Sequence, residues 1–444
     1  MSKLLKTFET LLILLGFYLV LLLIYKTSFT LKPWEDEIIA LTSSLNFYTN
    51  LDFLPNTSYD NYSYGLTSGI LSSIGGVIGW SVTKDFVLTR VMNFIYIFLV
   101  QYFMTLYIFK NNKNFNHLYL IFFGLIQIIL VPWWFSTLYL IGEVISTLLF
   151  VNALFIYKSN KRLALFIMGS SVIFGKFLML IPTVLFFVSR IKTNNLKNHL
   201  KEGVYYLIPF IFWYSLIFLK IGYDGIALYF DQFVGTLVGR PDSGVQSISS
   251  FGLATVIENF NNSEAKTWTA ASLIRTSLTP ILLLFIVFKN RFNIQSQFDI
   301  KFSSIFFGLA GTFSWFWFLT PFKYIRQSTH FTLIVIFLSV YLFLYLYDLS
   351  LFYKVLLLLN LSLFLSDLKL VILFNVIVIL YYSNFLSKLK NYIKFETLLI
   401  LIFVLNLVNM NNEVNNKDTF NTQFDSCSND LFSERCVDQY LYSD

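Results

Sequence analysis

The sequence predicts an all-α polytopic membrane protein. Hydrophobic residues make up 56% of its 444 residues and charged residues only 13%, whereas a soluble domain would carry roughly twice that charge. Many segments run for about 17–22 residues with few or no charges, which is enough to cross a bilayer as a helix. We therefore expect one transmembrane domain over residues 1–410 with about 12–13 helices, followed by a short polar tail over 411–444.

The first apolar segment covers residues 11–24 and follows the basic residues Lys3 and Lys6. This layout is typical of a signal peptide, but no small-residue cleavage site follows it. We expect an uncleaved first span whose N-terminus is cytoplasmic. The net charge of +7 comes from Lys and Arg in short loops, which orient a membrane protein and do not indicate nucleic-acid binding.

Hydropathy predicts the remaining spans. They lie near 87–109, 117–133, 137–157, 163–188, 203–219, 275–288, 302–320, 331–347, 353–366, 370–383 and 395–410. The basic loops that we expect in the cytoplasm are 110–113, 158–162, 190–201, 289–301 and 388–394.

The segment 163–188 cannot be a simple span under this topology, because the basic loops on its two sides would then lie on opposite faces of the membrane. It contains Gly175 and Lys176 near its middle and then Pro182. We expect a helical hairpin that enters the membrane and returns to the same face.

Three regions then lie outside the cell: 27–85, 220–274 and the tail. Long loops of this kind usually carry function. In the first of them we expect a helix starting at Pro33 and an interfacial helix over 66–82, lying on the membrane. The tail contains Cys427 and Cys436, for which a small disulfide loop and two free thiols are both open alternatives.

Three consecutive carboxylates, Glu35, Asp36 and Glu37, follow Pro33 directly after the first span. Charges this close to hydrocarbon are costly, which indicates an ionised site at a membrane face. A structural alternative is that acidic residues favour the N-terminus of a helix through its dipole. Successive helical residues point about 100° apart, so the three carboxylates cannot all face one site.

The order of these features resembles the GT-C superfamily of integral-membrane glycosyltransferases, which includes protein O-mannosyltransferases and lipid A aminoarabinose transferases. The resemblance covers about the first 190 residues, and the rest matches only in layout. No single motif is specific to the superfamily, so the resemblance rests on the order and spacing of the motifs. The pieces are Asp36-Glu37, the stretch 60–65, Arg90 within 85–91, Glu143 early in the fourth span, and Gly175-Lys176-Phe177.

The resemblance implies an inverting transfer of a sugar from a polyprenyl-phosphate carrier to an acceptor hydroxyl. A carboxylate beside that hydroxyl can accept its proton as the glycosidic bond forms, and Asp36 is the first candidate, with Glu35 or Glu37 as alternatives. Glu35 and Glu143 are candidates for positioning the acceptor or a metal. Mg²⁺ or Mn²⁺ held by Asp36, Glu37 and Glu143 is a further option, since both ions prefer oxygen ligands.

The departing lipid phosphate needs positive charge to stabilise it. The candidates on the expected outer side are Lys176, Arg240, Lys323, Arg326 and His330. Each has a simpler alternative: Arg240 can lie in a surface turn, the stretch 323–330 can be an interfacial anchor, and Glu143 can be a structural carboxylate. If 163–188 is one straight span, Lys176 becomes a charged residue in the middle of the membrane with no assigned role.

Two other classes stay open. An O-antigen-type polysaccharide polymerase or ligase would rely on Arg240 and Arg275 in outer loops. A lipid-linked glycan flippase would perform no chemistry, and it predicts paired broken helices. In all three cases the partners are a lipid-linked sugar and membrane lipids. A transferase would also take a lipid, glycan or protein acceptor. The bias toward Lys, Asn, Ile and Phe indicates a bacterial inner membrane, with the site facing outward.

Overall fold

The computed structural model describes most of the hydrophobic part of the chain. The described residues are 2–30, 35–51, 69–110, 117–127, 137, 140, 142–190, 196–227, 253–254, 257, 270–289, 301–319, 329–345, 349–365, 368–382 and 395–416. Within these ranges the regular structure is helical and no strand occurs.

Four described helical segments are long and apolar enough to cross a membrane: Leu4–Ser28, Phe86–Phe109, His199–Ile221 and Phe395–Asn412. They belong to α1 (Ser2–Thr30), α4 (Phe86–Phe109), α10 (Leu196–Ile221) and α20 (Phe395–Asn416). The chain therefore has the character of a helical membrane protein, as the sequence predicted at this level.

The remaining α-helices are shorter or less uniformly apolar than these four. They are α2 (Glu35–Asn50), α3 (Ile74–Thr83), α5 (His117–Ile126), α7 (Glu143–Ile156), α8 (Lys161–Ser170), α9 (Leu180–Arg190), α13 (Ala270–Lys289), α15 (Phe302–Ser314), α16 (Thr329–Leu344), α17 (Leu351–Ser362) and α18 (Leu368–Tyr382).

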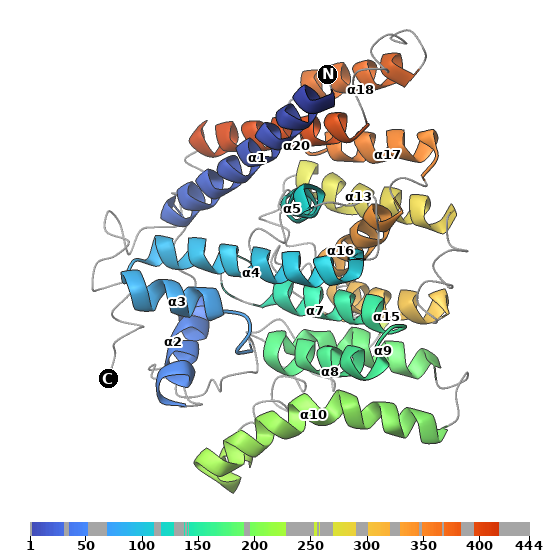
Figure 1. Ribbon diagram of the computed structural model, residues 1–444. Helices are drawn as coiled ribbons and strands as arrows, with labels where there is room; N and C mark the ends of the chain where they lie inside the picture. The colour runs from blue at the N-terminus through green and yellow to red at the C-terminus, as the bar shows by residue number, and fades with distance from the viewer. Residues whose placement is uncertain are drawn as a thin grey trace.

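Figure 1 shows most helices side by side in one stack, from α1, α17, α18 and α20 at one end to α10 at the other. One hydrophobic core runs through this stack. Val20, Phe94, Phe150, Phe337 and Phe403, which come from five different helices, are all 0% exposed. The core holds α1, α4, α7, α16 and α20 together by burial of apolar area.

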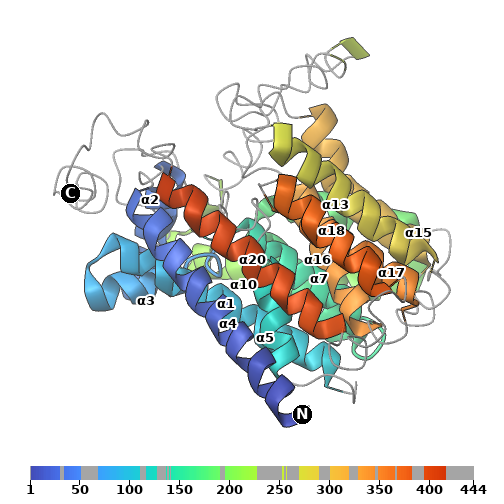
Figure 2. The same cartoon turned by 90° about the horizontal axis from the view of Figure 1, so that it is seen from above.

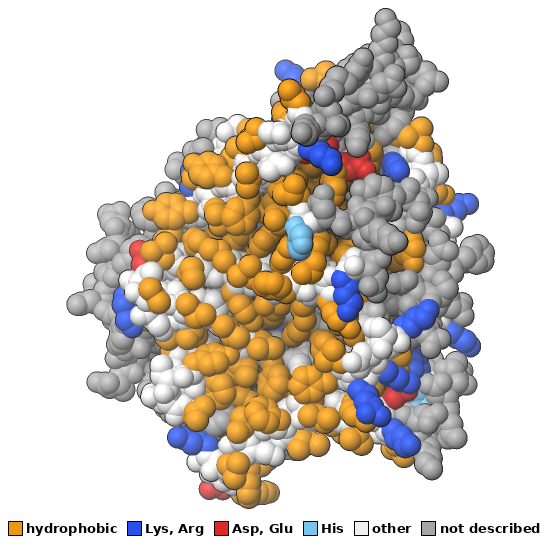
Figure 3. Space-filling view, viewed as in Figure 1, with side chains coloured by type: hydrophobic (Ala, Val, Ile, Leu, Met, Phe, Trp, Pro, Cys, Tyr) orange, Lys and Arg blue, Asp and Glu red, His pale blue; other side chains and the backbone are white. Residues whose placement is uncertain are grey.

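The outer faces of the stack are also apolar. On α10, Ile211 and Leu219 are 60% and 80% exposed, and on α18 Ile372 is 56% exposed. Figure 3 shows a broad hydrophobic face with Lys and Arg side chains gathered along one edge. Large exposed apolar surfaces are typical of a surface that faces lipid or a partner, and they are rare on soluble monomers.

Helices α1 and α20 lie side by side in both cartoon views (Figures 1 and 2). The Thr397 hydroxyl donates to Glu9 Oε1 at 2.6 Å, and Asn411 Nδ2 donates to the Leu19 carbonyl at 3.2 Å. Glu9 and Thr397 both lie near the start of their helices, so α1 and α20 run parallel.

The segment between 161 and 190 is broken in the middle. After α8 comes a π-helical turn over Ser171–Gly175, then Lys176 in extended conformation at φ −141° and ψ 126°, then a 3₁₀ turn and α9. The ends meet at Glu202, which pairs with Lys161 before the break and with Arg190 after it, the latter at 2.9 Å. The segment therefore doubles back on itself.

Helix α3 is shorter than the interfacial helix expected over 66–82. It begins at Ile74 and packs antiparallel along the first turns of α4. The packing is close because Gly75 and Gly79 face α4: a Cβ at these positions would lie 2.6 Å from Asn93 Cα and 2.8 Å from Thr89 Cα. Backbones this close require residues without side chains.

The fourth predicted span, 137–157, is interrupted at Gly142, although Thr137 at its start is helical. Helix α7 starts at Glu143, because Gly142 before it has a φ of +77°. A left-handed residue interrupts an α-helix, and glycine adopts this conformation without steric cost. Glu143 therefore lies in the first turn of its helix, where a carboxylate is favoured by the helix dipole.

Candidate functional site

Glu37 and Arg90 form an ion pair that is closed to solvent, with both side chains 0% exposed. Arg90 Nε donates to Glu37 Oε1 at 2.8 Å, and Nη2 donates to Oε2 at 2.6 Å. Arg90 Nη1 donates to the Ser28 carbonyl at 2.9 Å, and the guanidinium lies 4.8 Å from the centre of the Phe86 ring. One guanidinium thus connects the end of α1, the first turn of α2 and the first turn of α4.

This arrangement gives Glu37 a structural task. Both of its oxygens accept charge-assisted hydrogen bonds from Arg90, which fix the direction of the carboxylate. A general base needs a free lone pair beside the acceptor hydroxyl. The geometry therefore favours Glu37 as the residue that positions α2, and it leaves Asp36 as the first candidate base.

Glu143 and Lys176 form a second, more open pair. Lys176 Nζ lies 3.1 Å from Glu143 Oε1, and the side chains are 19% and 5% exposed. Lys176 is the extended residue at the break between the π-helical turn and the 3₁₀ turn, and Glu143 begins α7. The ammonium is therefore held by a carboxylate and still reaches the surface of the bundle.

Residues 69–73, here called the strap, attach the end of the first loop to this break. The Gly69 N–H donates to the Gly175 carbonyl at 2.8 Å, and the Leu71 N–H donates to the Phe174 carbonyl at 2.9 Å. A Cβ on Gly69 would lie 2.3 Å from the Phe174 carbonyl carbon, so only glycine fits there. The π-helical turn leaves these carbonyls available, and the strap satisfies them.

Two tyrosines hold the strap from the other sides. The Tyr48 hydroxyl on α2 donates to the Ile70 carbonyl at 2.7 Å, and the Tyr96 hydroxyl on α4 donates to the Leu71 carbonyl at 2.9 Å. Partial burial raises the pKa of Tyr48 to about 12, so its hydroxyl stays a donor near neutral pH. The strap is thus tied to α2, α4 and the break beside Lys176.

An apolar cluster connects the two ion pairs. Its buried members are Leu41, Val77, Trp80, Phe86 and Leu140. Leu41 lies one turn after Glu37 on α2, Phe86 lies one turn before Arg90 on α4, and Leu140 comes three residues before Glu143. The packing therefore places both pairs around the same end of the bundle.

One buried amide adds a polar link across this end. Asn93 Oδ1 accepts from the Gly76 N–H at 3.3 Å, and Asn93 Nδ2 donates to the Thr137 carbonyl at 3.2 Å. Asn93 lies on α4, one turn after Arg90. It ties α3 and the chain before α7 to the helix that carries the closed pair.

The structure brings together only part of the predicted set. Glu143 and Lys176 meet, and Glu37 meets Arg90, which the sequence marked as a motif residue without a role. The backbones of Glu35 and Asp36 begin α2 and that of His330 lies in α16, but these side chains are outside the described residues. Arg240, Lys323, Arg326, Cys427 and Cys436 also lie outside the described ranges.

Within the described part of the chain, no three His, Cys, Asp or Glu side chains form a group that could hold a metal ion. Glu37 and Glu143, two of the three predicted metal ligands, each face a cationic side chain of the protein. The described oxygens therefore do not form a shared site for a divalent cation.

Sequence reasoning missed the strap and the two tyrosines that bind it. The available signal was Gly69, since an isolated glycine often marks a close backbone approach. It also passed over Glu202, the partner of Lys161 and Arg190, because a single acidic residue in a basic loop has no distinctive spacing.

We compared the chain with protein-family models, with curated proteins and with solved structures, and none of them matches it.

Proposed function

We propose that this protein is a GT-C-like membrane glycosyltransferase. It moves a sugar from a polyprenyl-phosphate carrier to an acceptor hydroxyl at the outer face of the membrane in which it lies. The observation that carries the proposal is the open pair. Lys176 lies at a helix break, partly exposed and beside a carboxylate, and the strap ties this break to α2, which begins with the acidic run. A cation and a set of carboxylates at one end of a membrane bundle suit transfer from a lipid phosphate.

The proposed chemistry is a single displacement. The acceptor oxygen bonds to the anomeric carbon while the bond from that carbon to the phosphate oxygen breaks, and its electron pair leaves with the polyprenyl phosphate. The acceptor proton passes to Asp36, which later releases it to water. Attack from the face opposite the phosphate inverts the anomeric centre.

Lys176 stabilises the phosphate in this proposal. In the free protein Glu143 neutralises its ammonium at 3.1 Å, so the charge is not left alone near hydrocarbon. An incoming phosphate then binds the Lys176 ammonium, either together with Glu143 or in its place. Arg240, Lys323, Arg326 and His330 remain candidates for further phosphate contacts.

Glu37 and Arg90 act as positioning residues. Their bidentate contact fixes the first turn of α2 against α1 and α4. Asp36 is the residue before Glu37 in the sequence, so the contacts that fix this turn also fix the backbone that carries the candidate base. In the proposal the closed pair holds this turn in place and takes no part in the proton transfer.

The proposed orientation places the acidic run outside a bacterial inner membrane, with 161–190 as a hairpin that returns to the cytoplasmic face. Three features support it. Both ends of that segment reach Glu202, Lys158 and Arg162 are exposed in the turn before α8 and at the start of α8, and α1 runs parallel to α20. Basic residues are enriched on the cytoplasmic side of membrane proteins.

The test is transfer by the purified full chain in proteoliposomes. Undecaprenyl-phosphate-linked hexoses and pentoses are supplied one at a time, with a cell-envelope extract as acceptor, and release of undecaprenyl phosphate is measured by mass spectrometry. One carrier sugar should be consumed, and Asp36→Asn should lower the rate by about 100-fold or more. An arm with EDTA decides whether a divalent cation is needed.

Lys176→Met should lower the rate comparably, and Lys158→Met, a matched change in the basic turn after α7, should leave it unchanged. A polymerase or ligase would consume diphosphate-linked glycans in place of these donors. A flippase would move the donor across the bilayer without releasing the phosphate. Full activity of Asp36→Asn in well-folded protein would refute the proposal.

A further inference from the structure

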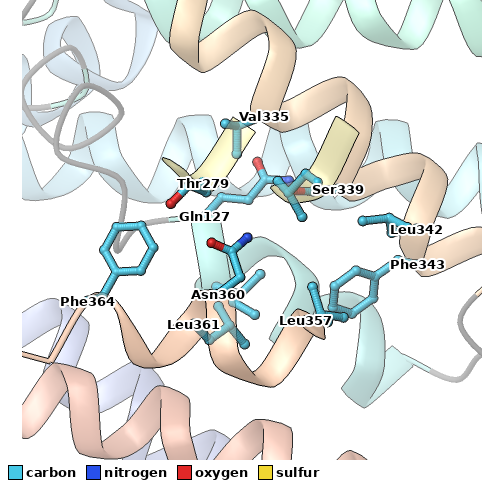
Figure 4. A pocket seen from close by; sticks show the side chains of 12 residues that line it. Gln127, Thr279, Val335, Ser339, Leu342, Phe343, Leu357, Asn360, Leu361 and Phe364 are labelled. Carbon is cyan, nitrogen blue, oxygen red and sulfur yellow. The ribbon is translucent and has the colours of Figure 1, made fainter. Parts of the chain in front are cut away.

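A pocket of about 40 Å³ lies between α5, α13, α16 and α17 (Figure 4). It shares no residue with either ion pair. Its described lining is largely apolar and contains no charged side chain, and the polar residues in it are Gln127, Thr279, Ser339 and Asn360. Four segments of the bundle thus each contribute one neutral hydrogen-bonding side chain to one small space.

Three of these side chains are buried, and each carries a polar atom without a partner. Among the residues that the structure describes, Gln127 Nε2, Thr279 Oγ1 and Asn360 Oδ1 have no hydrogen-bond partner, although these residues are only 1%, 3% and 2% exposed. Figure 4 shows the amide of Asn360 pointing toward Gln127 and Thr279 across the pocket. Gln127 is held in place because its Oε1 accepts from Gln101 Nε2 at 2.8 Å.

Unpaired polar atoms at this depth are costly, and buried polar groups in proteins are nearly always hydrogen-bonded to protein or ordered water. The three atoms supply one donor, one acceptor and one hydroxyl that can do either. This combination suits a guest that both donates and accepts. An ion would find no opposite charge in the lining, so a charged ligand would lose its hydration without compensation.

The size of the pocket narrows the guest further. One water needs roughly 10–15 Å³ of such volume, so a pocket of about 40 Å³ has room for about three or four waters. A water in such a site needs two to four polar partners, and this pocket offers them.

We propose that this pocket is a binding site for ordered water, occupied by a cluster of about three or four molecules inside the hydrophobic bundle. The waters connect Gln127, Thr279 and Asn360. Through these residues they join the end of α5 to α13 and α17. The proposal is independent of the glycosyltransferase function, because the pocket contains none of the residues assigned to that reaction.

Radiolytic hydroxyl-radical labelling of the full chain in nanodiscs tests the proposal, because the radicals form from water at the site. Phe343 and Phe364 line the pocket and are 3% and 5% exposed, whereas Phe150 lies in the dry core at 0%. We expect oxidation of Phe343 and Phe364 to exceed that of Phe150 by several-fold. Thr279→Val combined with Asn360→Leu should abolish the excess. Labelling at the level of Phe150 in the unmodified protein would overturn the proposal.

A second measurement does not depend on labelling. Thr279→Val keeps the side-chain volume and removes only the hydroxyl. In a hydrated pocket it should lower the unfolding temperature by about 1–3 °C, because the waters lose a partner. In a dry pocket the same substitution should raise the unfolding temperature, because an unpaired hydroxyl is removed. Thr105→Val is the matched control, since the Thr105 hydroxyl bonds the Gln101 carbonyl of its own helix at 2.7 Å.

Discussion

The two ion pairs at the α2 end of the bundle use similar groups in different ways. Glu37 and Arg90 are both 0% exposed and meet through two hydrogen bonds, and Arg90 also binds the end of α1. Glu143 and Lys176 meet at 3.1 Å, and the lysine is 19% exposed. Arginine offers a planar fork that matches a carboxylate, whereas lysine offers a flexible point charge.

The difference between the two pairs distinguishes a structural contact from a group that can bind a ligand. A closed, bidentate pair has no capacity left for a ligand, and its contacts fix three helices relative to one another. An open pair can exchange its carboxylate for a phosphate. The closed contacts of Glu37 and Arg90 therefore favour a structural role, and the open contact of Lys176 is compatible with the ligand binding proposed for it, although both acidic residues belong to the same predicted set.

The largest expected effect comes from breaking the closed pair. Arg90→Ala leaves the Glu37 carboxylate buried without its partner, which should destabilise the protein by about 3–5 kcal/mol. The measurement is the unfolding temperature and the yield of monodisperse protein in detergent. The double variant Glu37→Met with Arg90→Met should recover much of that loss, because no charge is then buried alone. Normal stability of Arg90→Ala would contradict a structural role.

Gly142→Ala tests how the open pair is positioned. Its φ is +77°, and a Cβ there would lie 2.4 Å from Ser72 Oγ and 2.8 Å from the Gly175 carbonyl oxygen. We expect a loss of about 1–3 kcal/mol together with lower transferase activity, since both Glu143 and the strap must shift. Gly203→Ala is the control. It lies within α10 with nothing within 4 Å of the added Cβ, and it should be neutral or stabilising. Equal effects would show that the clash does not matter.

Lys176→Met sharpens the comparison directly. The ammonium is partly exposed, and Glu143 keeps the favourable field of the α7 N-terminus, so we expect a loss of only about 1–2 kcal/mol. Transferase activity should nevertheless be lost. The distinction between a structural contact and a ligand-binding group fails if Lys176→Met unfolds as readily as Arg90→Ala. It also fails if Lys176→Met keeps the proposed transferase activity.

The smallest effect concerns the strap. Tyr48→Phe removes the hydrogen bond to the Ile70 carbonyl and should cost about 0.5–1.5 kcal/mol. Hydrogen–deuterium exchange of residues 69–73 should rise in this variant, because one of the contacts that hold the strap is gone. Unchanged exchange would mean that the contacts at Phe174, Gly175 and Tyr96 hold the strap without Tyr48.

The long apolar helices could be predicted closely from the sequence. The span predicted over 87–109 is observed as Phe86–Phe109, and the one over 395–410 as Phe395–Asn416. Hydropathy reports how much of a segment avoids water, and continuous apolar helices of this length leave few alternatives. The break at Gly175 and Lys176 was accessible for a related reason, since a mid-segment lysine conflicts with a straight span.

The contacts between helices could not be predicted. Glu37 and Arg90 are 53 residues apart, and nothing in the spacing of either residue indicates the other. Hydropathy does not tell which face of a helix meets which neighbour, so the strap, the interruption at Gly142 and the pocket beside Gln127 were all missed. The roles of Asp36, Arg240, Lys323, Arg326 and His330 remain predictions, since their side chains lie outside the described residues.

The parallel contact of α1 with α20 has a consequence for biosynthesis. Thr397, the partner of Glu9, is made 388 residues after it, so the earliest helix spends most of translation without that contact. A carboxylate on an apolar helix is unfavourable until it is satisfied. The ribosome must therefore complete α20 before the nascent bundle can close. A chain that stops short of residue 395 should be recognised by quality-control proteases, and supplying the missing helix in trans should rescue it.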